Sequence, residues 1–178
     1  MDDCQLIILL KNPKTREPAF NRLVDLYKER LYWQIRRMVL THEDTDDVLQ
    51  NTFIKAWQGL DAFRGEAQLS TWLFRIAANE TLNFLERKRP AQSIDGEAGA
   101  VAEQLESDPY FDGDETELQL QQAIALLPER QRQVFLMKYY DEMPYEQMSR
   151  VLDTSVGALK ASYHHAVKKI ADFFRHHD

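Results

Sequence analysis

The chain has 178 residues, of which 44% are hydrophobic and 11% aromatic, with only six glycines and six prolines. This composition is typical of a globular protein, is poor in the turn residues that a β-sandwich needs, and predicts an all-α fold. The single cysteine, Cys4, excludes an internal disulfide and a cysteine-based zinc site. The apolar run at residues 6–10 is too short for an export signal or a membrane span, so we predict a cytoplasmic protein without membrane insertion.

The net charge of −7 is distributed unevenly along the chain. Residues 91–117 contain nine acidic and no basic residues, together with glycine, proline and serine, whereas residues 11–90 and 118–178 are both mildly basic. This pattern predicts two small helical domains, residues 1–90 and residues 118–178, joined by an acidic flexible linker. Composition alone favours a solvated spacer for this linker.

Residues 42–60, HEDTDDVLQNTFIKAWQGL, separate into two faces on a helical wheel. The polar face contains one large apolar side chain, that of Ile54. An isolated exposed isoleucine is common on protein surfaces, but it can also anchor a partner, and the wheel alone leaves both interpretations open. The opposite face is apolar and predicts core packing for Val48, Leu49, Thr52, Phe53, Ala56, Trp57 and Leu60.

A second amphipathic helix is predicted from a cap at Ser70 or Thr71 as far as Pro90, after the turn-like sequence DAFRGEAQ. Its polar stripe contains Trp72 among arginines and asparagines. An aromatic plane beside amide and guanidinium groups suits single-stranded nucleic acid, which needs stacking, base-edge hydrogen bonds and phosphate contacts. Trp72 can equally cover the core at the start of the helix, and the spacing leaves both interpretations open, although the basic residues 87–89 favour nucleic acid.

The last sixty residues predict a helix-turn-helix motif, with helices in LPERQRQVFLMKYYDEM, PYEQMSRVLD and SVGALKASYHHAVKKI. Thr154 or Ser155 is expected to cap the third helix. The outward face of this helix has small residues near its N-terminus and lysines further along, which suits an α-helix that enters a DNA groove. Its inward face is predicted to contain Val156, Leu159, Tyr163, Ala166, Val167 and Ile170.

The sequence contains no phosphate-binding loop, nucleophile elbow or pair of carboxylates in an apolar setting. No enzyme, small-molecule substrate or cofactor is therefore predicted. The adjacent pairs His164-His165 and His176-His177 do not predict a metal site, because neighbouring residues of a helix point about 100° apart. Neither pair is completed by a carboxylate or thiolate.

The order and spacing of these segments resemble the extracytoplasmic-function group of bacterial sigma factors. DDVLQNTFIKAW is similar to the family's core-polymerase-binding helix, and FRGEAQLSTWLFRIAANETLNFLERKRP to its promoter-melting and minus-10-reading region. LPERQRQVFLMKYYDEMPYEQMSRVLDTSVGALKASYHHAVKKI resembles the part that binds the minus-35 element. The resemblance covers nearly the whole chain and implies a sigma region 2-like helical bundle followed by a sigma region 4-like helix-turn-helix domain. It also implies core RNA polymerase, promoter DNA and an anti-sigma factor as partners.

The resemblance assigns candidate residues to three surfaces. Contacts with core polymerase are expected from Asp47, Gln50, Asn51, Ile54 and Gln58. Contacts with the minus-10 element are expected from Phe63, Arg64, Trp72, Arg75, Asn79, Asn83, Arg87 and Lys88. Contacts with the minus-35 element are expected from Ser155, Gly157, Ala158, Lys160, Ala161, Ser162, His164, His165 and Lys168.

The chain also departs from the family pattern in the helix-turn-helix. The family often has arginine where this chain has Ser162, His165 and Val167, and often glycine in the turn where this chain has Asp153. Because fewer fixed positive charges mean fewer phosphate contacts, we expect weak DNA binding by the chain alone.

These features predict a promoter-specificity subunit of RNA polymerase. The first domain would dock on the polymerase and capture an unstacked minus-10 base, the second would read duplex DNA, and the linker would make the second contact intramolecular. The resemblance also implies that the acidic linker enters a basic polymerase channel. An autonomous helix-turn-helix regulator, which binds duplex DNA without polymerase, is the alternative. A helical adaptor without a DNA role is disfavoured by the basic, aromatic helix at residues 72–89.

Overall fold

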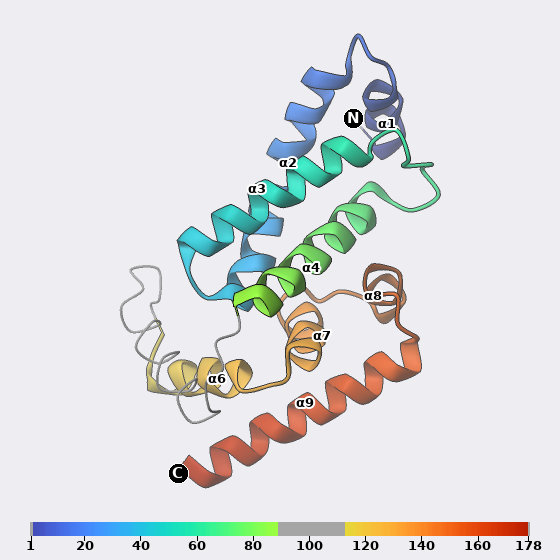
Figure 1. Cartoon of the computed structure of the whole chain (residues 1–178). Helices are drawn as coiled ribbons and strands as arrows, with labels where there is room; N and C mark the ends of the chain where they lie inside the picture. Colours follow the sequence, from blue (N-terminus) through green and yellow to red (C-terminus); the bar gives the residue numbers. More distant parts are fainter. Residues whose placement is uncertain (1, 89–112, 178) are drawn as a thin grey trace.

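The computed structural model describes residues 2–88 and 113–177, which form α-helices joined by short turns (Figure 1). The all-α prediction is therefore confirmed. Among the described helices, none is both long and apolar enough to cross a membrane. The N-terminal half contains α1 (Asp3–Lys11), α2 (Arg16–Val39), α3 (His42–Gly59) and α4 (Leu69–Lys88), and the C-terminal half contains α6 (Glu115–Ala125), α7 (Glu129–Tyr139), α8 (Tyr145–Leu152) and α9 (Val156–His177).

The acidic linker predicted at residues 91–117 lies mostly outside the described residues. Its C-terminal end does not: α6 begins at Glu115, so the last three residues of the predicted linker are helical. The Asp114 carboxylate starts this helix by accepting a hydrogen bond from the Glu117 N–H at 2.9 Å. Within residues 113–177, the C-terminal half thus has four helices rather than the three that the sequence predicted.

Short polar side chains fix the starts of the helices that carry the predicted sites. The Thr41 hydroxyl accepts a hydrogen bond from the Asp44 N–H at 3.2 Å and begins α3. Ser155 is the cap of α9, because its hydroxyl accepts from the Ala158 N–H at 3.2 Å. Helix α4 begins at Leu69, so Ser70 and Thr71 lie within its first turn and the cap predicted at one of them is wrong.

The turn between α8 and α9 contains a residue in the left-handed conformation. Asp153, which ends α8, has φ 50° and ψ 47°. Aspartate tolerates this conformation better than most residues with a side chain, so it can take the place of the glycine that the family pattern has here. The turn is closed by the Thr154 N–H, which donates to the Ser149 carbonyl oxygen at 3.3 Å.

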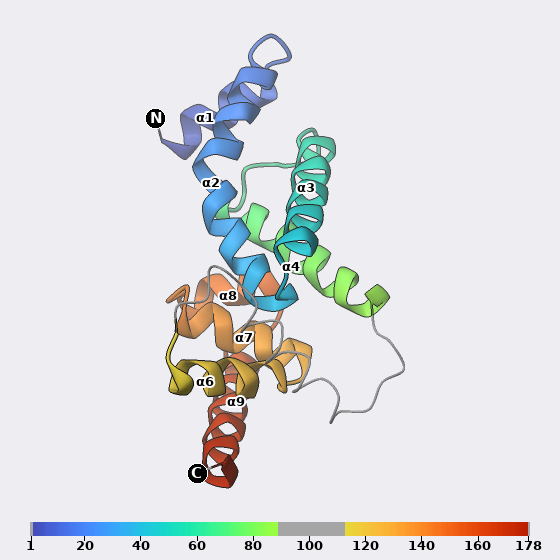
Figure 2. The same cartoon turned by 90° about the vertical axis from the view of Figure 1, so that its left-hand side faces the viewer.

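The two halves of the chain pack directly against each other (Figures 1 and 2). Helix α4 contacts α8 and α2 contacts α7, and buried side chains from both halves form one continuous hydrophobic core. A buried hydrogen bond of 3.3 Å joins the Gln133 side-chain amide of α7 to the Ala78 carbonyl oxygen of α4. The sequence predicted two domains joined by a linker, and the structure adds an interface between them.

Candidate polymerase and promoter surfaces

The five polymerase-contact residues predicted on α3 are all exposed. They recur every three or four positions, so they share one side of the helix. Ile54 lies at the centre of this stripe with 47% of its surface exposed. The structure therefore brings together the whole predicted set, which consists of Asp47, Gln50, Asn51, Ile54 and Gln58.

Trp57 corrects one detail of the predicted core. The helical wheel placed this side chain on the buried face of α3, but it is 43% exposed. Its ring packs edge-on against Phe20 of α2, with centroids 5.1 Å apart, so only part of its surface is covered. Because Trp57 is one turn from Ile54, the exposed apolar area of α3 is larger than the sequence predicted.

The polymerase-contact stripe continues onto the C-terminal end of α4. A surface depression of about 380 Å³ is lined by Asp47, Gln50 and Asn51 from α3 and by Phe84, Arg87 and Lys88 from α4. An ion pair between Lys88 and Asp44 holds the two helices together here. Two of the predicted minus-10 residues thus lie beside the predicted polymerase surface.

The polar stripe of α4 is exposed as predicted from the wheel, with Arg75, Asn79 and Asn83 one turn apart. Trp72, at the start of this stripe, is partly buried and stacks on Phe63, with ring centroids 4.6 Å apart and an interplanar angle of 30°. Phe63 itself is buried. Trp72 therefore covers part of the core, while the rest of its side chain is accessible.

A cavity of about 450 Å³ lies beside the stacked pair, between α3, α4 and the loop that joins them. Gly65 in this loop has φ 73°, a conformation that glycine adopts without strain. The Lys11 ammonium lies 5.9 Å from the centroid of the Phe63 ring. The same ammonium donates a hydrogen bond to the Leu60 carbonyl oxygen at 2.6 Å. The cavity is lined by Lys55, Gly59, Ala62, Phe63, Arg64, Glu66, Ala67, Trp72 and Ile76.

Two basic residues that the sequence reasoning did not select also border the α4 stripe. Lys55 forms an ion pair with the buried carboxylate of Glu80, which ties α3 to α4. Arg130, from α7, lines a second cavity of about 400 Å³ together with Asn79 and Asn83. No local pattern could have revealed Arg130, because it reaches this place only through the packing of the two halves.

The outward face of α9 is exposed along most of its length. Only Ser162 among its predicted minus-35 residues is partly covered. Lys160 lies 5.7 Å from the ring centroid of Tyr145, at the start of α8, and Lys138 lies 4.5 Å from the same ring. The exposed members of the predicted set are Ser155, Gly157, Ala158, Lys160, Ala161, His164, His165 and Lys168.

Val167 of α9 differs from the face that the wheel predicted, whereas Lys169 makes a contact that the wheel did not indicate. Val167 was expected to pack inward but is 42% exposed, because α9 extends to His177 and the neighbouring helices do not cover this part of its surface. Lys169 is exposed, but its ammonium donates to the Gln131 side-chain oxygen of α7 at 3.1 Å. Lys169 is therefore engaged by a neighbouring helix, whereas the Lys160 ammonium lies over an aromatic ring.

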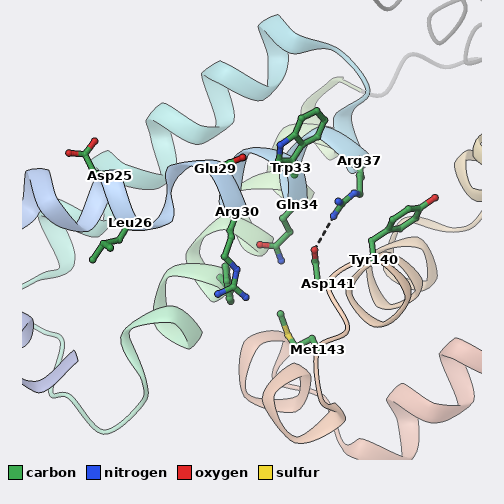
Figure 3. Close-up of a pocket in the computed structure, with 11 residues that line it drawn as sticks. Asp25, Leu26, Glu29, Arg30, Trp33, Gln34, Arg37, Tyr140, Asp141 and Met143 are labelled. Atoms are coloured by element: carbon green, nitrogen blue, oxygen red, sulfur yellow. Dashed lines mark hydrogen bonds and ion pairs between the residues drawn. The ribbon is translucent and has the colours of Figure 1, made fainter. Parts of the chain in front are cut away.

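An ion pair joins the two halves beside a cavity of about 390 Å³ (Figure 3). Nη1 of Arg37 in α2 lies 2.9 Å from Oδ1 of Asp141, which follows α7. The same guanidinium lies over the Tyr140 ring, 4.8 Å from its centroid. Burial raises the pKa of Asp141, and Arg37 and Arg30 only partly oppose this effect. Burial, with the nearby carboxylate of Glu117, raises the pKa of Tyr140 to about 12.

Comparisons with known proteins agree with this arrangement. Residues 23–90 match the family Sigma-70 region 2, and residues 117–170 match Sigma-70, region 4. The ECF RNA polymerase sigma factor SigW of Bacillus subtilis (strain 168) is 31% identical over 161 residues, which cover 85% of this chain and 86% of SigW. The ECF RNA polymerase sigma-E factor of Escherichia coli (strain K12) is 30% identical over 165 residues, which cover 87% of this chain and 86% of that protein.

Two solved structures share the fold. CnrH, in complex with the cytosolic domain of CnrY, is 24% identical, with a TM-score of 0.73 over 99% of both chains. The sigma factor RpoE from Bartonella quintana, in complex with the anti-sigma factor NepR, is 19% identical, with a TM-score of 0.66 over 88% of this chain and 96% of RpoE. The two sigma-70 regions occur in the order that the sequence predicted. Together with the identity to SigW and sigma-E over more than four-fifths of the chain, they show that the chain belongs to the extracytoplasmic-function group of RNA polymerase sigma factors.

Proposed function

We propose that this sigma factor directs core RNA polymerase to its promoters through three surfaces and carries no chemistry of its own. The α3 stripe binds core polymerase, the α4 stripe and its cavity bind the minus-10 element, and α9 binds the minus-35 element. The observation that carries the proposal is the cavity at the start of the α4 stripe, beside the stacked Phe63 and Trp72 rings. A helix-turn-helix regulator that reads only duplex DNA has no need of such a cavity.

The cavity suits a base that has left the DNA stack. Its volume lies within the range of small-ligand pockets. Trp72 offers an aromatic surface, Arg64 and Lys55 offer cations for phosphates, and Asn79 further along the helix offers an amide for a base edge. Unstacking a base costs a few kcal/mol, and stacking with base-specific hydrogen bonds offsets this cost only at the correct sequence.

The helix-turn-helix contributes the duplex contacts. Gly157 and Ala158 allow the backbone of α9 to approach base edges, and Lys160 and Lys168 lie where phosphates would pass. The positive charge here is modest, so polymerase rather than electrostatic attraction brings α9 to its site. The relatives CnrH and RpoE were solved with partner proteins, and we infer that a regulator of this kind, an anti-sigma factor, also binds this chain in the cytoplasm.

The polymerase surface is tested by Ile54→Asp, because a charge at the centre of the α3 stripe would have to be buried in the complex. We expect the wild-type chain with core RNA polymerase to give start sites on a library of promoter-like DNA, and the variant to lose at least nine-tenths of these transcripts. Ile8→Asp is the matched control, because Ile8 is 68% exposed on α1 and belongs to none of the three predicted surfaces.

Equal transcription by Ile54→Asp and Ile8→Asp would refute the α3 assignment. A wild-type chain that gives no start sites, yet binds duplex DNA specifically without polymerase, would favour the autonomous regulator instead.

A further inference from the structure

The loop between α3 and α4 forms much of the proposed minus-10 cavity, and two cations from the start of the chain contact the loop where it leaves α3. These cations are Lys11, the last residue of α1, and Arg16, the first residue of α2. Both precede residue 23, where the match to Sigma-70 region 2 begins. The cavity residues that the loop supplies are Ala62, Phe63, Arg64, Glu66 and Ala67.

The C-terminal end of α3 has no basic residue in its own last turn. The last carbonyl groups of a helix have no partner within it and carry partial negative charge, which a nearby cation stabilises. The Lys11 ammonium is this cation, because it donates to the Leu60 carbonyl oxygen at 2.6 Å and to the Asp61 carbonyl oxygen at 3.4 Å. A side chain of α1 therefore caps α3 at the point where the cavity loop begins.

Arg16 connects the same point to α1. Its Nε donates to the Leu10 carbonyl oxygen at 3.0 Å, and its Nη2 lies 2.7 Å from Oδ1 of Asp61. Leu10 and Leu6 are buried in the core, so α1 is a fixed support. Lys11 and Arg16 therefore hold the start of the loop from a part of the chain that is itself anchored.

We propose that Lys11 and Arg16 are positioning residues for minus-10 recognition, which fix the cavity loop without touching DNA. Lys11 also acts on the aromatic pair, because its ammonium lies 5.9 Å from the centroid of the Phe63 ring on which Trp72 stacks. This role rests on the proposed function, since it supposes that the cavity receives a minus-10 base. The contacts that hold the loop do not depend on that function.

Lys11→Met tests the role in recognition, because it removes the ammonium and keeps most of the apolar side chain. With core RNA polymerase, promoter opening should fall about 5- to 10-fold, which corresponds to the net contribution of one ordinary hydrogen bond. Opening is measured by permanganate reactivity on promoters that differ in the base at each minus-10 position. The preference for the correct base should also fall, whereas the polymerase concentration for half-maximal transcription should stay unchanged because the α3 stripe is intact.

The position of the loop has a readout that needs neither polymerase nor DNA. The Ala62 and Phe63 N–H groups both donate to the Gly59 carbonyl oxygen, at 3.1 and 3.0 Å. Hydrogen exchange of these two amides, followed by nuclear magnetic resonance, should be faster in Lys11→Met than in the wild type. Arg16→Met should act in the same direction. Amides in the middle of α2 should exchange at the wild-type rate in both variants.

Lys14→Met is the matched control. It makes the same chemical change three residues further along, at an exposed position that belongs to none of the three predicted surfaces. This variant should leave amide exchange, promoter opening and base preference unchanged. Lys11→Arg keeps a cation that can donate to the same carbonyl groups, so it should retain most of the opening and of the base preference.

Several results would overturn the proposal. Unchanged exchange of the Ala62 and Phe63 amides in Lys11→Met would show that Lys11 does not hold the loop. Faster exchange along the whole chain, with an equal loss of opening at every promoter, would mean that Lys11 only stabilises the fold. Equal effects of Lys11→Met and Lys14→Met would reduce the role to total charge. If the wild-type chain opens no promoter, the proposed function fails, and the exchange result still decides whether Lys11 and Arg16 hold the loop.

Discussion

The proposed promoter-reading surfaces of α4 and α9 are built in different ways. The α4 stripe borders two cavities, and their walls come from α3, from the loop before α4 and from Arg130 of the other half. The outward face of α9 is a row of exposed side chains on one helix, which begins with Gly157 and Ala158. A surface with depth can hold a base removed from the stack, whereas a narrow exposed helix fits the groove of an intact duplex. In the proposed function, one chain thus carries separate surfaces for melted and for double-stranded DNA.

The largest expected difference between the two surfaces concerns Trp72. Trp72→Ala removes the stacking plane at the cavity, and loss of one base-aromatic stack costs about 1–3 kcal/mol, or roughly 5- to 150-fold in promoter opening. Opening is measured by permanganate reactivity of thymines near the start site, with core polymerase present. Binding of the upstream duplex by α9 should not change.

Trp72→Phe keeps an aromatic ring on Phe63 and should retain most of the opening activity. If Trp72→Ala opens promoters as well as the wild type does, the ring only covers the core, which is the other interpretation that the sequence allowed. A loss of helical circular dichroism in the alanine variant, but not in the phenylalanine variant, would lead to the same conclusion.

A smaller effect should separate two lysines of α9. Lys160→Ala removes a cation proposed to contact a phosphate, so it should weaken promoter binding uniformly across sequences. The salt slope, which is the slope of the logarithm of the binding constant against the logarithm of the salt concentration, should fall in magnitude by about 1. Lys169→Ala removes the same charge, but this ammonium already donates a hydrogen bond to the Gln131 side-chain oxygen of α7. Its salt slope should stay within error of the wild type. Equal slopes for the two variants would mean that α9 attracts DNA only through its total charge.

The sequence predicted those parts of the fold and of the site that depend on local spacing. The polar stripes of α3 and α4 and the turn before α9 follow from residues one helical turn apart or from a single cap such as Ser155. The exposed position of Ile54 follows in the same way. Local patterns suffice here because the helix period and the capping hydrogen bonds involve only neighbours in the chain.

The parts that the sequence did not predict depend on long-range packing. Trp57 is exposed because Phe20 covers only one side of its ring, and nothing near Trp57 in the sequence indicates this. The contact of Arg37 with Asp141, 104 residues further along the chain, likewise follows from the packing of α2 on α7. A wheel assigns a side chain to a face, but neighbouring helices decide how much of that face they cover.

The smallest expected effect is a pH dependence of stability that arises between the two halves of the molecule. In the folded chain burial raises the pKa of Asp141 above its usual value of 3.8, although Arg37 and Arg30 face the carboxylate. Tyr140, Asp25 and Glu29 line the same cavity. In the unfolded chain water reaches Asp141 and its pKa returns toward the usual value. Folding is then coupled to proton uptake by this carboxyl group, so its contribution to stability is lost as the pH rises through the folded-state pKa.

Asp141→Asn removes this titration, because the amide cannot ionise but its oxygen can still accept a hydrogen bond from Arg37. At pH 7 the variant should unfold at the same temperature as the wild type or a slightly higher one, and its unfolding temperature should depend less on pH. Thermal unfolding of both proteins, followed by circular dichroism at several pH values between 4.5 and 7.5, measures the difference. If acid instead destabilises the wild type more than the variant, the attraction between Arg37 and the carboxylate outweighs the cost of burying it.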